Sequence, residues 1–353
     1  MRSARNLSWA VAVLAALPIT RAAAQPGRGA STSRPSSVSV GEPGTPLSEA
    51  ARRIAADVPD EGTPNPGEHY PISNEFRHDL WFDHIRDLGG AFVGVGADQC
   101  YTLAAVQNAS IVWVVDFDPL VPVIHRLYGV LVPATATPAE LVARFEEGAV
   151  DATVALLEER LAGAPDREAV IGAYRRNRAR MHGYLRRVLR NPRQGSWLSD
   201  PALYARVRAL HEGGRVIARN GDVTANGALR AVGNAARQLG VPVRVLYFSN
   251  AEQFFPYGTE LRANVNNLPV DERTVVLRTF REPGIVYPEG DRWHYMVQPF
   301  ADMWARISEN GYRNSRMFVR DLMARRSHYV GESGLSVLNG DVPRRYQLAR
   351  DSD

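Results

Sequence analysis

The chain has 353 residues, of which 45% are hydrophobic and 23% are charged, values typical of a globular protein with one large or two small domains. All 42 of its basic residues are arginine. The absence of lysine excludes a phosphate-loop lysine, a pyridoxal Schiff base and a lysine general base. A net charge of +4 does not by itself indicate a nucleic-acid partner.

The first 24 residues have the pattern of an export signal. Arg2 and Arg5 precede an apolar run over residues 8–19, and small residues follow at 22–24. The apolar run is too short to span a bilayer as a mature helix. We therefore predict a signal peptide over residues 1–24 and, once it is cleaved, a periplasmic or cell-envelope protein. An uncleaved N-terminal membrane anchor is the alternative.

Composition divides the remaining chain into three parts. Residues 25–70 are rich in Pro, Gly, Ser and Thr, which predicts a disordered linker with one short helix near residues 47–56. Residues 71–308 alternate strand and helix patterns and predict an α/β domain. Residues 309–353 are expected to form a C-terminal extension with one amphipathic helix at residues 317–323.

The α/β part contains nearly continuous apolar runs, which predict strands buried on both faces of a sheet at residues 91–95, 111–116, 215–218, 242–248 and 274–280. Helical spacing of apolar residues predicts helices at residues 76–88, 98–107, 121–131, 225–239 and 300–307. Two further patterns are a helical insertion over residues 138–212 and a hairpin joining residues 285–287 to 293–297.

This order predicts a doubly wound, mostly parallel α/β sheet, with the helical insertion after the second strand and a C-terminal hairpin. Right-handed crossovers bring the carboxyl ends of the first four strands to a common edge. Such sheets bind their ligands at that edge.

The turn after the first strand reads Gly94-Val-Gly96-Ala-Asp98-Gln99, and Asp116 ends the second strand. This arrangement opens a nucleotide-binding unit, in which the acidic tip of the second strand holds a ribose hydroxyl. Asp98 replaces the third glycine of the dinucleotide fingerprint. A carboxylate at a helix start repels phosphate and favours a cationic group such as an α-ammonium or sulfonium. The alternative is that Asp98 only caps the helix.

Polar residues after the other strands add to the same edge. Asp118 is expected to cap the turn into the next helix. Asp222 follows the third strand in an Asn-Gly-Asp sequence that equally predicts a tight turn. Ser249 and Asn250 follow the fourth strand, with Glu252 two residues later, and they equally predict the cap of a short helix.

These motifs carry a family resemblance. Residues 74–308 resemble the class I methyltransferase superfamily, the Rossmann-like fold that binds S-adenosylmethionine. The motifs at residues 94–99, 116–118 and 247–250 are similar to an uncharacterised bacterial family with that fold. The chain departs from the superfamily at Phe92, where an acidic residue is usual, and at Asp98.

The resemblance implies a role for each motif. Gly94 and Gly96, with Asp98 and Gln99, would lie beside the amino-acid part of the cofactor. Asp116 would hold the ribose and Asp222 would contact the adenine. Ser249 would lie at the cofactor site, whereas Asn250 or Glu252 would orient the methyl acceptor.

Two functions follow as hypotheses. The first is methyl transfer from S-adenosylmethionine to an unknown acceptor, which needs alignment of the two reactants and no metal. Export would separate the protein from this cytoplasmic metabolite. The second hypothesis is therefore an exported, non-catalytic protein that binds another small molecule or a partner in the same cleft.

Three further features have simpler interpretations. The eight arginines between Arg175 and Arg193 are expected to form a solvated helix face, with an anionic membrane surface as the alternative and no nucleic-acid partner. Cys100, the single cysteine, is expected to be a small buried apolar residue. His78 and His84 are six residues apart and point to different helix faces, so they do not predict a metal site.

Overall fold

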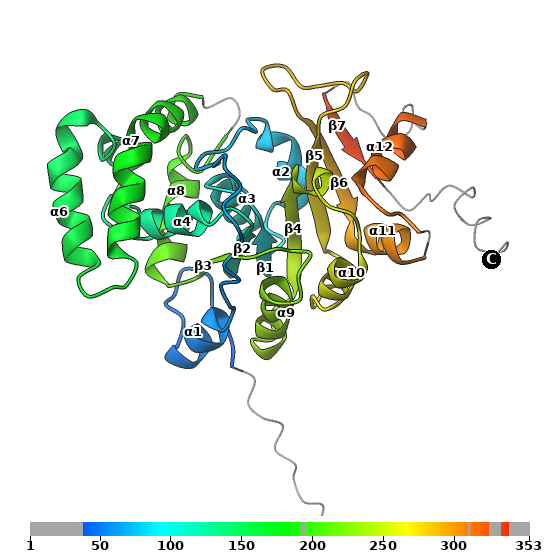
Figure 1. Cartoon of the computed structure of the whole chain (residues 1–353), viewed down its shortest axis with the longest axis horizontal. Coiled ribbons are helices and arrows are strands. Elements are labelled where there is room, and N and C mark those ends of the chain that lie inside the picture. The colour runs from blue at the N-terminus through cyan, green and yellow to red at the C-terminus, as the bar shows by residue number, and fades with distance from the viewer. Residues whose placement is uncertain (1–37, 192–194, 310, 325–332, 339–353) are drawn as a thin grey trace, which may run out of the picture. The chain divides into compact units, whose positions relative to one another are not determined.

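The computed structural model describes residues 38–191, 195–309, 311–324 and 333–338. The predicted signal peptide, Arg193 and residues 339–353 lie outside this part of the chain. Within the described residues, one sheet has the strand order β3-β2-β1-β4-β5-β6-β7 (Figure 1). The prediction of an α/β fold with a mostly parallel sheet is confirmed, and the arrangement is compatible with a Rossmann-like fold.

The strands are β1 (Ala91–Gly94), β2 (Ile111–Asp116), β3 (Val216–Asn220), β4 (Val243–Ser249), β5 (Val275–Phe280), β6 (His294–Pro299) and β7 (Leu335–Val337). Strands β1 to β5 are parallel to one another. Strand β6 is antiparallel to β5, and β7 is parallel to β6. The carboxyl ends of β1 to β5 therefore lie at one edge of the sheet.

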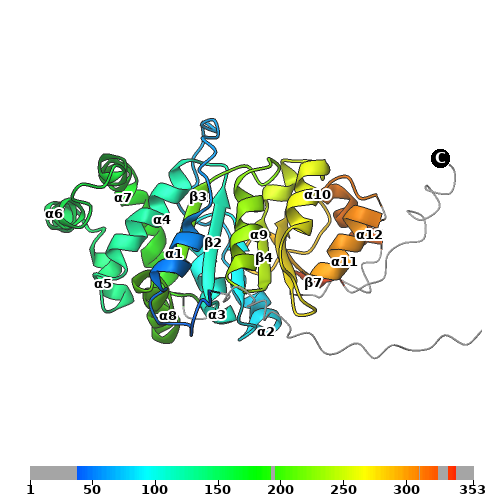
Figure 2. The ribbon, with the colours of Figure 1, turned by 90° about the horizontal axis from the view of Figure 1, so that it is seen from below.

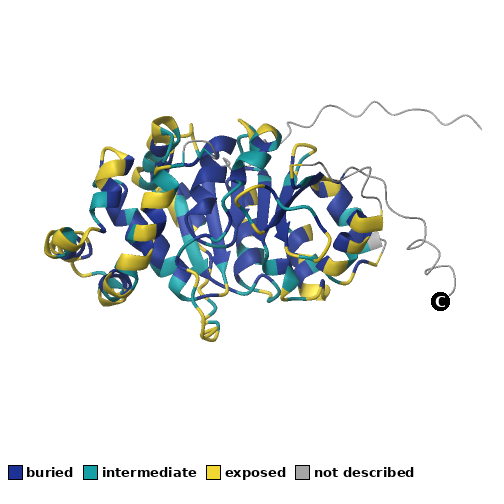
Figure 3. Cartoon of the chain, turned by 90° about the horizontal axis from the view of Figure 1, so that it is seen from above, coloured by how far each residue is buried: buried dark blue, intermediate teal, exposed yellow. Residues whose placement is uncertain are grey.

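Helices cover both faces of the sheet (Figures 1 and 2). The first face carries α1 (Glu49–Ala56), α9 (Ala228–Gln238), α10 (Thr259–Asn266), α11 (Phe300–Trp304) and α12 (Ser315–Ala324). The second face carries the 3₁₀ turn η1 (His78–Trp81) and the helices α2 (Phe82–Ile85), α3 (Gln99–Gln107), α4 (Leu120–Leu131) and α8 (Pro201–Glu212). The strands are consequently buried between two helical layers (Figure 3).

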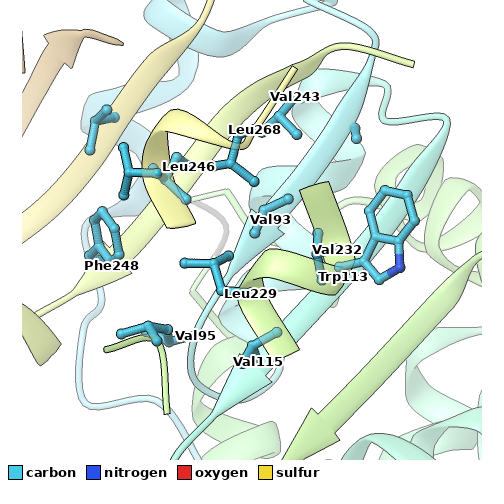
Figure 4. Close-up of a cluster of buried hydrophobic side chains, with 14 of the residues drawn as sticks. Val93, Val95, Trp113, Val115, Leu229, Val232, Val243, Leu246, Phe248 and Leu268 are labelled. Atoms are coloured by element: carbon cyan, nitrogen blue, oxygen red, sulfur yellow. The ribbon is translucent and has the colours of Figure 1, made fainter. Parts of the chain in front are cut away.

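Alternation along the strands builds the core under the first face. Val93 of β1 and Val95, the residue after this strand, point to the same side as Trp113 and Val115 of β2, because successive strand residues face opposite sides. Leu229 and Val232 lie one helical turn apart on α9, and these residues pack together in Figure 4.

A further apolar cluster joins α3 and α4 to the four helices that follow α4 before β3. These helices are α5 (Pro138–Ala143), α6 (Val150–Arg160), α7 (Arg167–Leu189) and α8. Trp197 lies in the loop before α8 and stacks on Tyr204, with the ring centroids 5.8 Å apart. The cluster encloses several buried polar side chains that belong to the candidate site.

The predicted hairpin is wrong in its first arm. Residues 285–287 form no strand, and β6 pairs with β5 over six residues instead. Pro283 and Pro288 flank the predicted arm, and proline has no N–H to donate to a sheet ladder. The prediction also omitted α10 and β7.

The short helix predicted near residues 47–56 is present as α1, and it packs against the sheet. Leu47, Ala51 and Ala55 lie four residues apart and pack into the core under the first face. The indole N–H of Trp113 donates to the carbonyl of Ala55 at 3.0 Å. The sequence pattern predicted this helix but not its packing against Trp113, which is a tertiary contact.

Leu47→Ala tests whether this segment belongs to the folded unit. Leu47 is only 4% exposed, and removing a buried leucine side chain lowers the free energy of unfolding by about 2–5 kcal/mol. The measurement is urea denaturation followed by circular dichroism. Glu49→Ala, at an exposed position of the same segment, is the control and should change stability by less than about 0.5 kcal/mol. Equal midpoints for the two variants would contradict the packing.

Candidate functional site

A cavity of about 570 Å³ lies at the carboxyl ends of β1, β2 and β4. This volume is within the usual range of small-molecule sites, and the position is where open α/β sheets bind ligands. Five of the predicted residues line it: Gly96, Gln99, Asp116, Ser249 and Asn250. The other four, Gly94, Asp98, Asp222 and Glu252, do not line it.

Asp116 holds the turn after β1. Its Oδ2 accepts the Gly96 N–H at 2.6 Å, and its Oδ1 accepts the Asp118 N–H at 2.8 Å. Burial raises the pKa of Asp116 to about 6, although both backbone bonds act in the opposite direction. Both carboxylate oxygens therefore already have a partner within the protein.

Gly96 has a backbone conformation that disfavours other residues. Its φ of +92° is strained for a residue with a side chain, and a Cβ atom would displace the amide end of Gln99. The Gly96 carbonyl contacts Nε2 of His125 at 2.9 Å, and Nδ1 of His125 contacts the Tyr101 hydroxyl at 2.6 Å. Burial lowers the pKa of His125 to about 4, so the ring is neutral at pH 7. Nε2 then donates to the carbonyl, and Nδ1 accepts from the hydroxyl.

Residues 60–75, which we call the edge segment, run across the carboxyl ends of the strands. Glu61 accepts the Asp222 N–H at 2.6 Å and the Ala228 N–H at 3.1 Å. Its carboxylate thus lies at the start of α9, the position that favours an anion at a helix N-terminus. The edge segment covers Asp222, where the resemblance implied an adenine contact.

Asp118 binds the middle of the edge segment. Its Oδ1 contacts Nδ1 of His69 at 2.7 Å and accepts the Leu120 N–H at 2.8 Å. The second bond caps the start of α4, which confirms the role expected for Asp118. Its Oδ2 accepts the Tyr70 N–H at 3.2 Å.

Glu75 ends the edge segment and is buried between the strands and η1. Its carboxylate accepts hydroxyl protons from Ser249 at 2.5 Å, Tyr247 at 2.6 Å and Thr279 at 2.6 Å. Nε2 of His78 lies 3.5 Å from the same carboxylate. Burial acts to raise the pKa of Glu75, but His78 and the hydroxyl bonds outweigh it, and the pKa is lowered.

Glu75 also explains the conformation of Ser249. Ser249 has a φ of +51°, which is uncommon outside glycine, and its hydroxyl is held by the Glu75 carboxylate. Glu75 and Glu61 were not predicted, since an isolated glutamate in a Pro/Gly-rich stretch has no distinguishing pattern. Only proximity in the fold reveals them.

Glu252 lies in the core rather than in the cavity. Its carboxylate pairs with Nε of Arg278 at 2.6 Å and accepts the Tyr257 hydroxyl proton at 2.9 Å. Burial raises its pKa, against the attraction of Arg278. In this position the carboxylate cannot orient a molecule in the cavity.

Asp98 points away from the cavity, toward the helices between β2 and β3. Its Oδ2 accepts the indole N–H of Trp197 at 3.0 Å and the hydroxyl proton of Tyr184 at 3.2 Å. Its side chain makes no capping bond to α3. Burial raises its pKa to about 6, which the bonds from Trp197 and Tyr184 only partly offset.

The other sequence features are placed as follows. The Cys100 thiol is buried, contacts the Val95 carbonyl at 3.2 Å and has a pKa raised well above its ordinary value by burial, which confirms its expected role. Several arginines in and directly after α7 are exposed: Arg175, Arg176, Arg180, Arg186, Arg187 and Arg190. Across the described residues, no group of three or more His, Cys, Asp or Glu could hold a metal. No helix in that same part is long and apolar enough to cross a membrane.

The fold and the site define an α/β protein with a ligand-sized cavity at the carboxyl edge of its sheet. Residues 70–339 match the model of a family described as a domain of unknown function, DUF7790. The match spans more than half of the chain, and the protein belongs to this family. No curated protein matches the sequence.

Asp98→Asn tests the cost of burying this carboxylate. The pKa is about 6 in the folded protein and near 3.8 when unfolded, so between these values the folded state keeps a proton that the unfolded state releases. The contribution of Asp98 to stability therefore falls as the pH rises from about 4 to about 6. At pH 7.5 we expect Asp98→Asn to be more stable than wild type by on the order of 2–3 kcal/mol.

Urea denaturation at pH 4, 5, 6 and 7.5 measures this difference. The difference should be small at pH 4, where the carboxyl is protonated in the folded state and about half protonated in the unfolded state. Asp166→Asn removes the same charge from a half-exposed position, where Asp166 pairs with Arg126, and should change stability by less than about 1 kcal/mol at every pH. A less stable Asp98→Asn at pH 7.5 would refute the assignment.

Proposed function

We propose that this protein binds a small polar molecule, of about the size of a nucleoside, in the cavity at the carboxyl ends of β1, β2 and β4. The position and volume of this cavity carry the proposal. Its inner wall has the carboxylate of Asp116 and the amide side chains of Asn74 and Asn250, which suit hydroxyl and amino groups.

The rim of the cavity has a different chemistry. Tyr70 and Phe254 are exposed aromatic residues that line it, and Phe254 is 80% exposed. Arg281 and Arg292 add positive charge at the same rim. A planar group packed on the aromatic rings, with its polar substituents inside the cavity, satisfies both parts.

One contact argues against the cofactor that the resemblance implies. Glu61 accepts the Asp222 N–H, at the position where adenine would lie. Asp116 keeps lone pairs beside its two backbone bonds and can still accept from a hydroxyl group. The Asp222 position does not fit the adenine of S-adenosylmethionine, so we derive no methyl-transfer step. The non-catalytic hypothesis is the one that we carry forward.

We also infer that α5 to α8 are an insertion into a plain doubly wound sheet. They separate β2 from β3 and share an apolar cluster with α3 and α4. This inference is supported by the length of the chain between the two strands, because one crossover helix is sufficient for a parallel connection.

Isothermal titration calorimetry of the full chain with adenosine, S-adenosylhomocysteine and S-adenosylmethionine tests the proposal. We expect adenosine to bind, and Phe254→Ala to weaken it by about tenfold or more, because stacking of a base on an aromatic ring contributes about 1–3 kcal/mol. Phe117→Ala is the matched control. Phe117 is 42% exposed near the same sheet edge but does not line the cavity.

Each outcome discriminates between the hypotheses. Absence of binding by all three compounds at millimolar concentration would reject the proposal, as would equal effects of Phe254→Ala and Phe117→Ala. Binding of S-adenosylmethionine and its demethylated product at least tenfold tighter than adenosine would instead favour the methyltransferase hypothesis.

A further inference from the structure

A second cavity, of about 240 Å³, lies on the other side of Gln99 from the first. Asp98, Gln99 and Thr102 of the α3 start form one wall, and Tyr184 and Trp197 form another. Gln99 lines both cavities, whereas Asp98 lines only the second. Nothing in the proposed function uses this space.

Two buried acceptor atoms in its wall have no partner. Asp98 is 0% exposed and Gln99 is 6% exposed, and neither Oδ1 of Asp98 nor Oε1 of Gln99 receives a hydrogen bond from the described residues. Buried polar atoms almost always have a partner. Both atoms are hydrogen-bond acceptors, so the missing partner is a donor.

The charges around the cavity define that donor. Asp98 and Glu75 are both carboxylates and line it together, which disfavours an anion. Trp197 and Tyr184 give the wall aromatic surface, which attracts a cation. Arg187 stands over the Phe76 ring, 3.9 Å from its centroid, on the outer wall. The acceptor atoms of Asp98 and Gln99 thus belong to the wall at the α3 start, whereas the guanidinium of Arg187 lies on the wall with Phe76.

Water is the simplest alternative occupant. One buried water needs only about 10–15 Å³. A cavity of about 240 Å³ therefore has room for a small organic molecule. Water would satisfy the two acceptors but would bring no positive charge to Oδ1 of Asp98, since His78, which also lines the cavity, lies beside Glu75. An ammonium group does both.

We propose that this second cavity binds a small primary ammonium compound, whose N–H groups donate to Asp98 Oδ1 and Gln99 Oε1. The site is separate from the cavity of the proposed function and does not depend on it. The alkyl part of the compound would pack against Phe76 and Trp197.

Calorimetry of the full chain with n-alkylammonium ions, from methylammonium to n-hexylammonium, tests this proposal. Affinity should rise about fourfold for each methylene that the cavity buries and then stop rising once it is full. n-Butanol lacks the charge, and tetramethylammonium lacks the N–H donors. Each should bind at least tenfold more weakly than n-butylammonium.

Asp98→Asn should weaken n-butylammonium at least tenfold and leave n-butanol unchanged, because the amide keeps an acceptor for Trp197 but loses the charge. Asp166→Asn, which removes a charge from the exposed start of α7, should have no effect. Phe254→Ala should also have no effect, which separates this site from the first cavity. The proposal is overturned if butanol and butylammonium bind wild type equally, or if neither binds up to roughly 100 mM.

Discussion

The buried carboxylate of Glu75 joins the segment before the first strand to the ends of β4 and β5. Three hydroxyl groups, from Tyr247, Ser249 and Thr279, donate to it, and His78 lies beside it. Ser249 lines the sheet-edge cavity, while Glu75 itself lines the second cavity. Glu75 therefore holds one part of the wall between the two cavities, and Gln99, which lines both, forms another.

Two further carboxylates, those of Asp116 and Asp118, hold the sheet edge beside β2. Asp116 holds the glycine turn through the Gly96 N–H, and Asp118 holds the edge segment through His69 and Tyr70. The acidic tip of β2 thus acts on the protein's own backbone, as the acidic tip of a nucleotide-binding sheet acts on a ribose. Glu61 acts in the same way at the start of α9. The edge is closed by side chains over β3 and open beside β1 and β4.

Sequence patterns predicted the strands, the alternation of helices and the glycine turn, because these depend on local periodicity and on residues with special backbone freedom. The direction of Asp98 depends on Trp197, about a hundred positions later, and no local pattern contains it. The edge segment has a linker-like composition, yet its carboxylates bind β-strand ends far along the chain. Such contacts are tertiary, so the closed half of the edge could not be predicted.

Among the carboxylates at the glycine turn and around the two cavities, Glu75, Asp98 and Asp116 differ in how fully they are hydrogen-bonded. Glu75 receives hydroxyl protons on both oxygens, and these bonds with His78 lower its pKa despite burial. Asp98 receives bonds on Oδ2 alone, and burial raises its pKa to about 6. Asp116 has both oxygens bonded to N–H groups, yet burial still raises its pKa to about 6. Of these three, only Asp98 combines a raised pKa with an oxygen that has no partner in the described protein, and a donor placed at that oxygen would offset the cost of burying its charge.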